Sequence, residues 1–168
     1  MFQRGDQVLY GIHGVCKITD LETRKIDRKM IEYYVLEPID QVGARFYIPT
    51  QNASAVSKLR PMITHNELDA LLRSGDACAD AWIADENQRK QHYRELITSG
   101  DCAALVQMVH TLHKHKEQQA TAGRKFHLCD ENFLRDAEKM LNTEFSLVLN
   151  IPQEEVKDYV QNAMSNDK

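Results

Sequence analysis

The hydrophobic pattern of this chain changes its period near residue 61. Before that point the apolar residues form short runs rich in β-branched and aromatic types, with turn residues between them. After it they recur at helical spacing over long stretches. These successive periods predict an α+β chain, with a small antiparallel β-barrel at residues 1–60 and an all-α domain at residues 61–168.

The first part contains short runs that predict strands at residues 7–10, 14–18, 31–36 and 45–49. A domain this small has little core, so its stability depends on a few large side chains, and we expect no deep active-site pocket in it. The expected core residues are Tyr10, Val15, Ile18, Tyr34, Leu36, Phe46 and Ile48.

Helix boundaries are marked in the second part. Thr64 and Glu67 have the spacing of a capping box, which predicts a helix start. Ser74-Gly75-Asp76 and Ser99-Gly100-Asp101 each place a glycine after one apolar run and an aspartate before the next. Pro152 suits the start of another helix, where its missing amide costs nothing. The expected helices are 65–73, 79–98, 102–118, 131–149 and 153–163, with a loop at 119–130.

Charge is distributed unevenly along the chain. The formal net charge of −4 excludes a uniformly basic nucleic-acid-binding protein, but residues 86–128 carry seven Lys and Arg against four Asp and Glu. Antiparallel helices could gather these cations on a face that fits a phosphate backbone; scattered surface charge is the equal alternative. The cations are Arg89, Lys90, Arg94, Lys114, Lys116, Arg124 and Lys125.

The first residues, Met1 to Asp6, lack the apolar region of a secretory signal, and no apolar run is long enough to cross a bilayer. We therefore expect a cytoplasmic protein without membrane contact. The four cysteines form no CxxC pair, so they are expected to be buried reduced thiols. They are Cys16, Cys78, Cys102 and Cys129.

A histidine-rich tract raises the possibility of a metal site. His110 and His113 lie at i, i+3, and His127 and Cys129 could add ligands. A structural zinc site normally shows two close ligand pairs, and His115 points to another side of the helix, so a solvated polar face is preferred. GxSxG, HExxH and phosphate-loop motifs are absent. We expect no enzymatic activity, no metal, no cofactor and no small-molecule substrate.

The single tryptophan, Trp82, lies in the polar segment Asp80-Ala81-Trp82-Ile83-Ala84-Asp85. Such surroundings favour partial exposure, which often marks an interface. Packing where the helical part meets the barrel is about equally compatible with this pattern.

Several of these segments together resemble a known family. The Gly5–Val15 segment (GDQVLYGIHGV), Glu22-Thr23-Arg24, Glu32–Leu36 and Tyr47-Ile48-Pro49 resemble the amino-terminal domain of the CarD/CdnL family of bacterial transcription regulators, which also occurs in the transcription-repair coupling factor. The resemblance continues through residues 99–101 and 130–149, so it covers nearly the whole chain.

The resemblance implies a two-part regulator without enzymatic activity. In this family a Tudor-like barrel binds the β subunit of RNA polymerase, and the helical domain contacts promoter DNA near the upstream edge of the transcription bubble. The expected effect is stabilisation of the open promoter complex, commonly at ribosomal RNA promoters, because a factor that binds the melted promoter more tightly shifts the population toward it.

Individual residues of this chain correspond to functional residues of the family that it resembles. Arg24 matches a polymerase-contacting arginine, Tyr47 stands where the family has a second arginine, and Arg45 lies two residues away on the same strand face. The register of the family's DNA-wedging tryptophan falls on Glu86, and Trp82 lies about one helical turn earlier. The residues expected to contact DNA are Trp82, Arg89, Lys90, Lys114, Lys116, Arg124 and Lys125.

Two other classes remain open. One is a protein-interaction adaptor that docks on polymerase or another partner without touching DNA, and the other is a thiol or histidine metal sensor. A flat salt dependence of DNA binding would favour the adaptor, and metal analysis would test the sensor.

Overall fold

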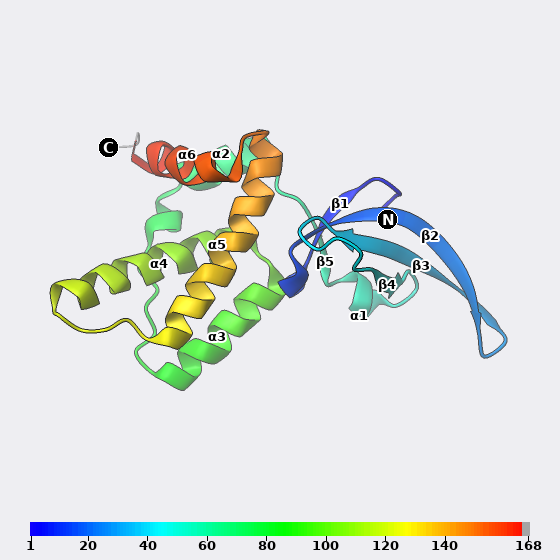
Figure 1. Cartoon of the computed structure of the whole chain (residues 1–168), viewed down its shortest axis with the longest axis horizontal. Helices are drawn as coiled ribbons and strands as arrows, with labels where there is room; N and C mark the ends of the chain where they lie inside the picture. Colours follow the sequence, from blue (N-terminus) through cyan, green and yellow to red (C-terminus); the bar gives the residue numbers. More distant parts are fainter. Residues whose placement is uncertain (166–168) are drawn as a thin grey trace. The chain divides into compact units, whose positions relative to one another are not determined.

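The structure is a computed structural model that describes residues 1–165, apart from the side chain of Cys78. The chain forms two compact units, of which the first comprises Met1–Met62 and the second begins at Ile63. Strands make up most of the first unit, and helices make up the second (Figure 1).

The first unit is an antiparallel sheet with the strand order β4-β3-β2-β1-β5. The sheet is open, since β4 and β5 are its two edges, so the Tudor-like barrel expected from the sequence is not confirmed. A short helix, α1, precedes β5 and begins at a capping residue, Asn52, whose side chain accepts the Ala55 N–H. The elements are β1 (Gln7–Tyr10), the 3-10 turn η1 (Gly11–His13), β2 (Val15–Ile26), β3 (Lys29–Pro38), β4 (Phe46–Pro49), α1 (Ala53–Val56) and β5 (Leu59–Pro61).

The β2–β3 hairpin is much longer than the sequence pattern indicated. Its turn consists of Asp27 and Arg28, both with positive φ (50° and 65°), which is the conformation of a tight two-residue hairpin turn. Pairing runs from Ile26 opposite Lys29 back to Cys16 opposite Pro38, with one irregularity between Ile18 and Asp20. The outer half carries charged residues on both faces, so it lacks the apolar alternation that identifies a half-buried strand.

Side chains from all five strands form the hydrophobic core of the sheet unit. Of the expected core residues, Tyr10 and Phe46 are only partly buried and pack against this core. The buried cluster consists of Val8, Cys16, Ile18, Tyr34, Leu36, Ile48 and Leu59.

The second unit begins as the sequence predicts. Thr64 caps α2 (His65–Arg73), and the reciprocal bonds between Thr64 and Glu67 confirm the capping box. The expected helix at 79–98 is wrong in its first turns, because Asp85 is the capping residue of α3 (Glu86–Ser99) and accepts the Gln88 N–H. Residues 79–85 are therefore not helical, and the expected one-turn relation between Trp82 and the helix face of Glu86 is wrong as well.

The last three helices are longer than expected, and the loop at 119–130 is correspondingly shorter. Gly100 and Asn150 end α3 and α5 in the left-handed conformation, at φ 65° and 54°. The core comes from several helices, with Leu68, Tyr93, Leu112 and Phe145 fully buried. None of the described helices has the length and apolar character needed to span a bilayer. The remaining elements are η2 (Gly75–Cys78), α4 (Cys102–Thr121), α5 (Leu128–Leu149) and α6 (Gln153–Ser165).

Candidate functional sites

Strand pairing in the sheet unit brings three of the expected functional residues to one exposed patch. Asp20 on β2, Val35 on β3 and Tyr47 on β4 lie opposite one another. The next residues along these strands, Leu21, Tyr34 and Ile48, also lie opposite one another, and their side chains point to the other face of the sheet. Because Tyr34 and Ile48 enter the core, Tyr47 lies on the opposite face, together with Glu22 and Arg24 two and four residues along from Asp20. We call Glu22, Arg24, Arg45 and Tyr47 the Tyr47 cluster.

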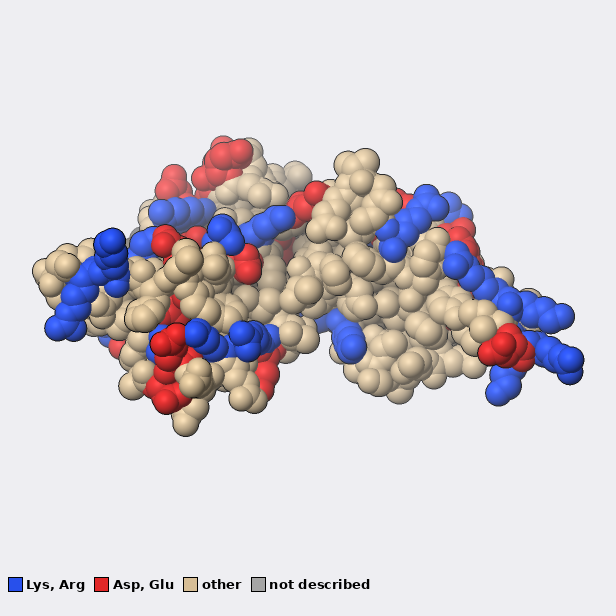
Figure 2. Space-filling view, turned by 60° about the horizontal axis from the view of Figure 1, so that its bottom comes forward, with Lys and Arg blue, Asp and Glu red and all other residues tan. Residues whose placement is uncertain are grey.

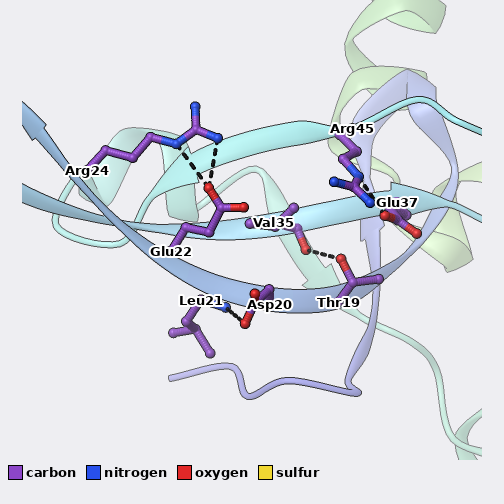
Figure 3. Close-up of polar contacts among 8 residues, drawn as sticks. All are labelled: Thr19, Asp20, Leu21, Glu22, Arg24, Val35, Glu37 and Arg45. Carbon is purple, nitrogen blue, oxygen red and sulfur yellow. Dashed lines mark hydrogen bonds and ion pairs between the residues drawn. The ribbon is translucent and has the colours of Figure 1, made fainter.

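Contacts within the Tyr47 cluster orient both of its arginines. Arg24 donates two hydrogen bonds to one Glu22 oxygen, at 3.0 and 2.7 Å, and its guanidinium carbon lies 3.9 Å from the centre of the Tyr47 ring. Arg45 donates to Glu37 at 2.8 Å (Figure 3). The pKa of Arg24 is raised first by Glu22 and then by Tyr47, and the pKa of Arg45 is raised chiefly by Glu37.

The Tyr47 cluster has the chemistry of a protein-docking surface. The Arg24 and Arg45 side chains are 46% and 58% exposed, so their remaining donors face solvent. A guanidinium that is already oriented by a carboxylate and an aromatic ring loses little side-chain entropy when it binds a carboxylate or a backbone carbonyl of a partner. The structure therefore brings together Arg24, Arg45 and Tyr47.

In the helical unit, Trp82 lies in the non-helical segment between η2 and α3. The Ala81 N–H donates to the Thr111 hydroxyl at 3.2 Å, which ties the segment to α4. Asp80 accepts a hydrogen bond from the Trp82 N–H at 3.2 Å and another from Lys114 at 2.8 Å. These contacts fix the backbone on the amino-terminal side of the indole.

The half-buried Trp82 ring is stacked on two planar groups. The His115 imidazole lies 3.5 Å away, centre to centre, at an interplanar angle of 14°. The Arg89 guanidinium carbon lies 4.3 Å from the indole centre, and because the imidazole covers one face at close contact, Arg89 covers the other. Burial lowers the pKa of His115, which favours the neutral imidazole in this stack.

Arg89 is an interior residue, so the expectation that it lies on a DNA-facing surface is wrong. Its side chain is 4% exposed and binds both oxygens of Asp130 at 2.9 Å. It also donates to the carbonyls of Ile83 and Ala84, at 2.9 and 3.3 Å. Burial lowers the pKa of Arg89, but the hydrogen bonds and charge of Asp130 outweigh that effect and raise it overall. Arg89 thus joins α3, α5 and the Trp82 segment.

The other expected DNA-contacting cations divide into paired and unpaired groups. Lys90 forms an ion pair with Glu86, Lys114 with Asp80 and Lys116 with Glu131. In contrast, Arg124 and Lys125 are exposed in the turn before α5, and no ion pair is formed by either within residues 1–165. Figure 2 shows the consequence, because acidic and basic side chains lie next to each other over the helical unit.

Two residues of the histidine tract are engaged in other contacts. His113 contacts Glu138 at 2.5 Å, whereas His115 is engaged in the stack with Trp82. Across the described part of the chain, no three His, Cys, Asp or Glu side chains are arranged to hold a metal ion. His110 and His113 instead line a groove of about 440 Å³ between α4, α5 and α6. Cys16 and Cys102 are buried thiols as expected, and Cys129 is half-buried.

Sequence reasoning missed several residues that build the Trp82 site. His115 was assigned to a solvated face, and the roles of Thr111 and Asp130 had no local signal, since each lies about 30 residues or more from its partner in the Trp82 segment or α3. Phe126, whose ring lies 6.2 Å from that of His115 and 5.7 Å from the Lys116 ammonium, was also missed.

Comparison with known proteins covers both units. Residues 2–61 match the family model of the CarD-like/TRCF RID domain, and residues 70–161 match that of the CarD C-terminal domain. The chain belongs to the CarD family. Members of this family are transcription regulators that interact with RNA polymerase. This CarD-family chain is also 21% identical to the "Putative transcription factor YdeB" of Bacillus subtilis (strain 168), over 95% of the chain and 99% of that relative.

Proposed function

We propose that this protein binds the β subunit of RNA polymerase through the Tyr47 cluster and contacts promoter DNA through the Trp82 end of its helical unit. The DNA contact lies near the upstream edge of the transcription bubble, and its effect is a more stable open complex, notably at ribosomal RNA promoters. The protein acts without catalysis and without a cofactor.

The observation that carries the polymerase half of the proposal is the Arg24–Tyr47 stack within a domain that matches the RID family. Tyr47 stands where the resemblance leads one to expect a second arginine, and here it supports the first one at 3.9 Å. Arg45, held by Glu37, supplies a second exposed guanidinium nearby. The cluster therefore keeps two cationic donors without an arginine at position 47.

The DNA half of the proposal is supported by the surroundings of Trp82. Arg124 and Lys125 are exposed and supply phosphate contacts, while Lys114 and Lys116 can exchange their carboxylate partners for phosphates. Both faces of the indole are covered, so Trp82 presents its edge rather than a free stacking face. An apolar edge held beside a duplex–bubble junction hinders reannealing of the strands.

Docking and DNA contact work together in this proposal. Few free cations give weak, salt-sensitive DNA binding, and attachment to polymerase supplies the effective concentration that this binding lacks. The free-energy shift toward open complex equals the difference in binding free energy between the open and closed states, so a tenfold larger ratio of open to closed complex requires about 1.4 kcal/mol.

The test is the lifetime of open complexes formed by the cognate polymerase on a ribosomal RNA promoter, with and without the protein, after addition of a competitor that traps dissociated enzyme. We expect a longer lifetime with the wild-type protein and no effect from an Arg24→Glu variant. An unchanged lifetime with intact polymerase binding would contradict the DNA half of the proposal.

A second candidate function is an adaptor that docks on polymerase and recruits another protein without contacting DNA. The observation that favours it is the pairing of Lys90, Lys114 and Lys116 with carboxylates, which leaves little net positive charge near Trp82. A binding constant for promoter DNA that changes little with salt concentration would support the adaptor.

A further inference from the structure

The tip of the β2–β3 hairpin carries the densest group of unpaired cations in the described part of the chain. The tip comprises residues 25–30, which contain three basic residues, Lys25, Arg28 and Lys29, and one acidic residue, Asp27. All six residues are exposed, and within residues 1–165 none of the three cations forms an ion pair or a side-chain hydrogen bond. Figure 2 shows basic side chains gathered where the hairpin ends, at the right of the view.

The tip belongs to a free ribbon of two strands. β1 pairs with β2 only at residues 15–17, and β4 pairs with β3 only at residues 33–36. Thr50, directly after β4, still donates its N–H to the Glu32 carbonyl, so three residue pairs, from Arg24 opposite Ile31 to Ile26 opposite Lys29, extend beyond the rest of the sheet. At about 3.3 Å per residue this ribbon is about 10 Å long, before its turn is counted.

Cations occupy both faces of the ribbon. Ile26 and Lys29 are direct partners and share one face, while Lys25 and Met30 are direct partners and share the other. Arg28 is at the turn between them. Each face also has one exposed apolar side chain, since Ile26 is 44% and Met30 is 62% exposed.

This arrangement fits a duplex better than it fits an acidic protein surface. A flat acidic surface engages one face of a ribbon and leaves the cations of the other face unused. The major groove of B-DNA, about 12 Å wide and 8.5 Å deep, admits a two-stranded ribbon and presents a phosphate wall to each face. Apolar side chains at the tip can then contact thymine methyl groups on the groove floor.

We propose that the hairpin tip is a second DNA-contacting element, which enters the major groove of duplex DNA with Lys25, Arg28 and Lys29 on its phosphates. This inference goes beyond the proposed function, in which the sheet unit binds polymerase and only the helical unit contacts DNA. Arg24 remains with Tyr47 and Glu22, behind the tip.

The test measures binding of the full-length protein to a fluorescent duplex of about two helical turns by anisotropy, between about 50 and 200 mM salt. The tip variant is Lys25→Gln/Arg28→Gln/Lys29→Gln. We expect it to bind at least about tenfold more weakly at low salt and to lower the slope of log K against log salt by about 2.7, because each phosphate contact contributes about 0.9. Methyl green, a major-groove ligand, should compete with the wild-type protein more strongly than the minor-groove ligand distamycin.

The matched control is Arg4→Gln/Lys17→Gln/Lys58→Gln, which removes the same charge from exposed positions of the same unit. It should bind the duplex like the wild type, apart from the weak effect of net charge. A tip variant that matches this control in affinity and slope overturns the proposal, and a tip-dependent affinity for labelled polyglutamate would then identify an acidic polypeptide as the partner.

A third variant separates this inference from the proposed function. Trp82→Ala/Arg124→Gln/Lys125→Gln removes the indole and the two cations without ion pairs from the DNA contact assigned to the helical unit, and leaves the paired Lys114 and Lys116. If it retains the tip-dependent part of the salt slope, the tip binds DNA whether or not the helical unit does. If instead it abolishes all duplex binding, the tip has no DNA contact of its own and the inference is overturned.

Discussion

Arg24 and Arg89 make the same pair of contacts in two different environments. Each guanidinium lies over an aromatic ring, at 3.9 Å from Tyr47 and 4.3 Å from Trp82, and each binds a carboxylate, Glu22 or Asp130. The Arg24 side chain is 46% exposed, whereas that of Arg89 is 4% exposed. Exposure makes the Arg24 guanidinium available to a partner, whereas burial makes the Arg89 guanidinium a structural connection within the protein.

The comparison predicts opposite consequences for stability and binding. An exposed ion pair is screened by water and contributes little to folding, so either partner can be substituted without unfolding the protein. A buried pair leaves an uncompensated charge when one member is removed. Arg89 should therefore control the free energy of unfolding, and Arg24 should control association with polymerase.

The largest expected effect is that of Arg89→Ala. Removal of the guanidinium leaves the Asp130 carboxylate buried and frees two backbone carbonyls, so the free energy of unfolding should fall by about 3–5 kcal/mol. Urea denaturation followed by circular dichroism measures it. The control, Arg94→Ala, changes an exposed arginine of the same helix and should have little effect. Equal stability of the two variants would contradict the structural role of Arg89.

A double variant sharpens this prediction. Arg89→Met/Asp130→Leu removes both charges and should recover part of the lost stability, because neither partner is left unpaired in the interior. If the double variant is less stable than Arg89→Ala alone, the loss arises from packing and the carbonyl contacts rather than from the unpaired carboxylate.

Trp82→Ala should have the next largest effect. Loss of stacking on His115 and Arg89 should lower the free energy of unfolding by about 1–3 kcal/mol, and the same variant should shorten the open-complex lifetime. Trp82→Phe keeps an aromatic ring and serves as the control for stacking. A folded Trp82→Ala protein with unchanged promoter opening would show that the indole is only structural.

A smaller, pH-dependent effect is expected from His115. Burial against Trp82 and Phe126 lowers its native pKa below the ordinary 6.5, with Arg89 and His127 acting in the same direction and Asp130 and Asp80 against it. The native state then binds fewer protons than the unfolded state, so stability is complete above about pH 6.5 and falls as the pH decreases.

Comparing the wild type with His115→Phe isolates this contribution. Unfolding free energies at about pH 7.5 and 5.5 should differ more for the wild type than for the variant, which retains a stacking ring but cannot titrate. His92→Phe, at an exposed position of α3, is the control. A variant that is as acid-sensitive as the wild type would assign the pH dependence to other groups.

The smallest effect on stability, paired with a large effect on binding, is expected from Arg24→Glu. The Arg24 side chain is 46% exposed and water screens its ion pair with Glu22, so the unfolding midpoint should change little. Affinity for the polymerase β subunit should fall at least about tenfold, because an attractive charge becomes repulsive. Pull-down and calorimetry measure the two properties. Lys17→Glu, an exposed change on the same strand, should bind normally.

The features that the sequence predicted correctly depend on neighbours along the chain. The Thr64–Glu67 capping box, the β1 strand at residues 7–10, and the α2 helix each follow from residues a few positions apart. The resemblance of the chain to the CarD family, matched at residues 2–61 and 70–161, rests on motifs of the same local kind. Such signals are visible without coordinates because the physical interactions that produce them are themselves local.

Tertiary structure decided the features that depend on distant residues. Arg89 is buried because Asp130, 41 positions later, compensates its charge, and no spacing rule reports that distance. The long β2–β3 ribbon forms although its outer faces are charged, since its ladder of backbone hydrogen bonds and its turn do not require an apolar face. The sequence by itself therefore determined the family and the two structural classes, and long-range packing determined which cations face solvent.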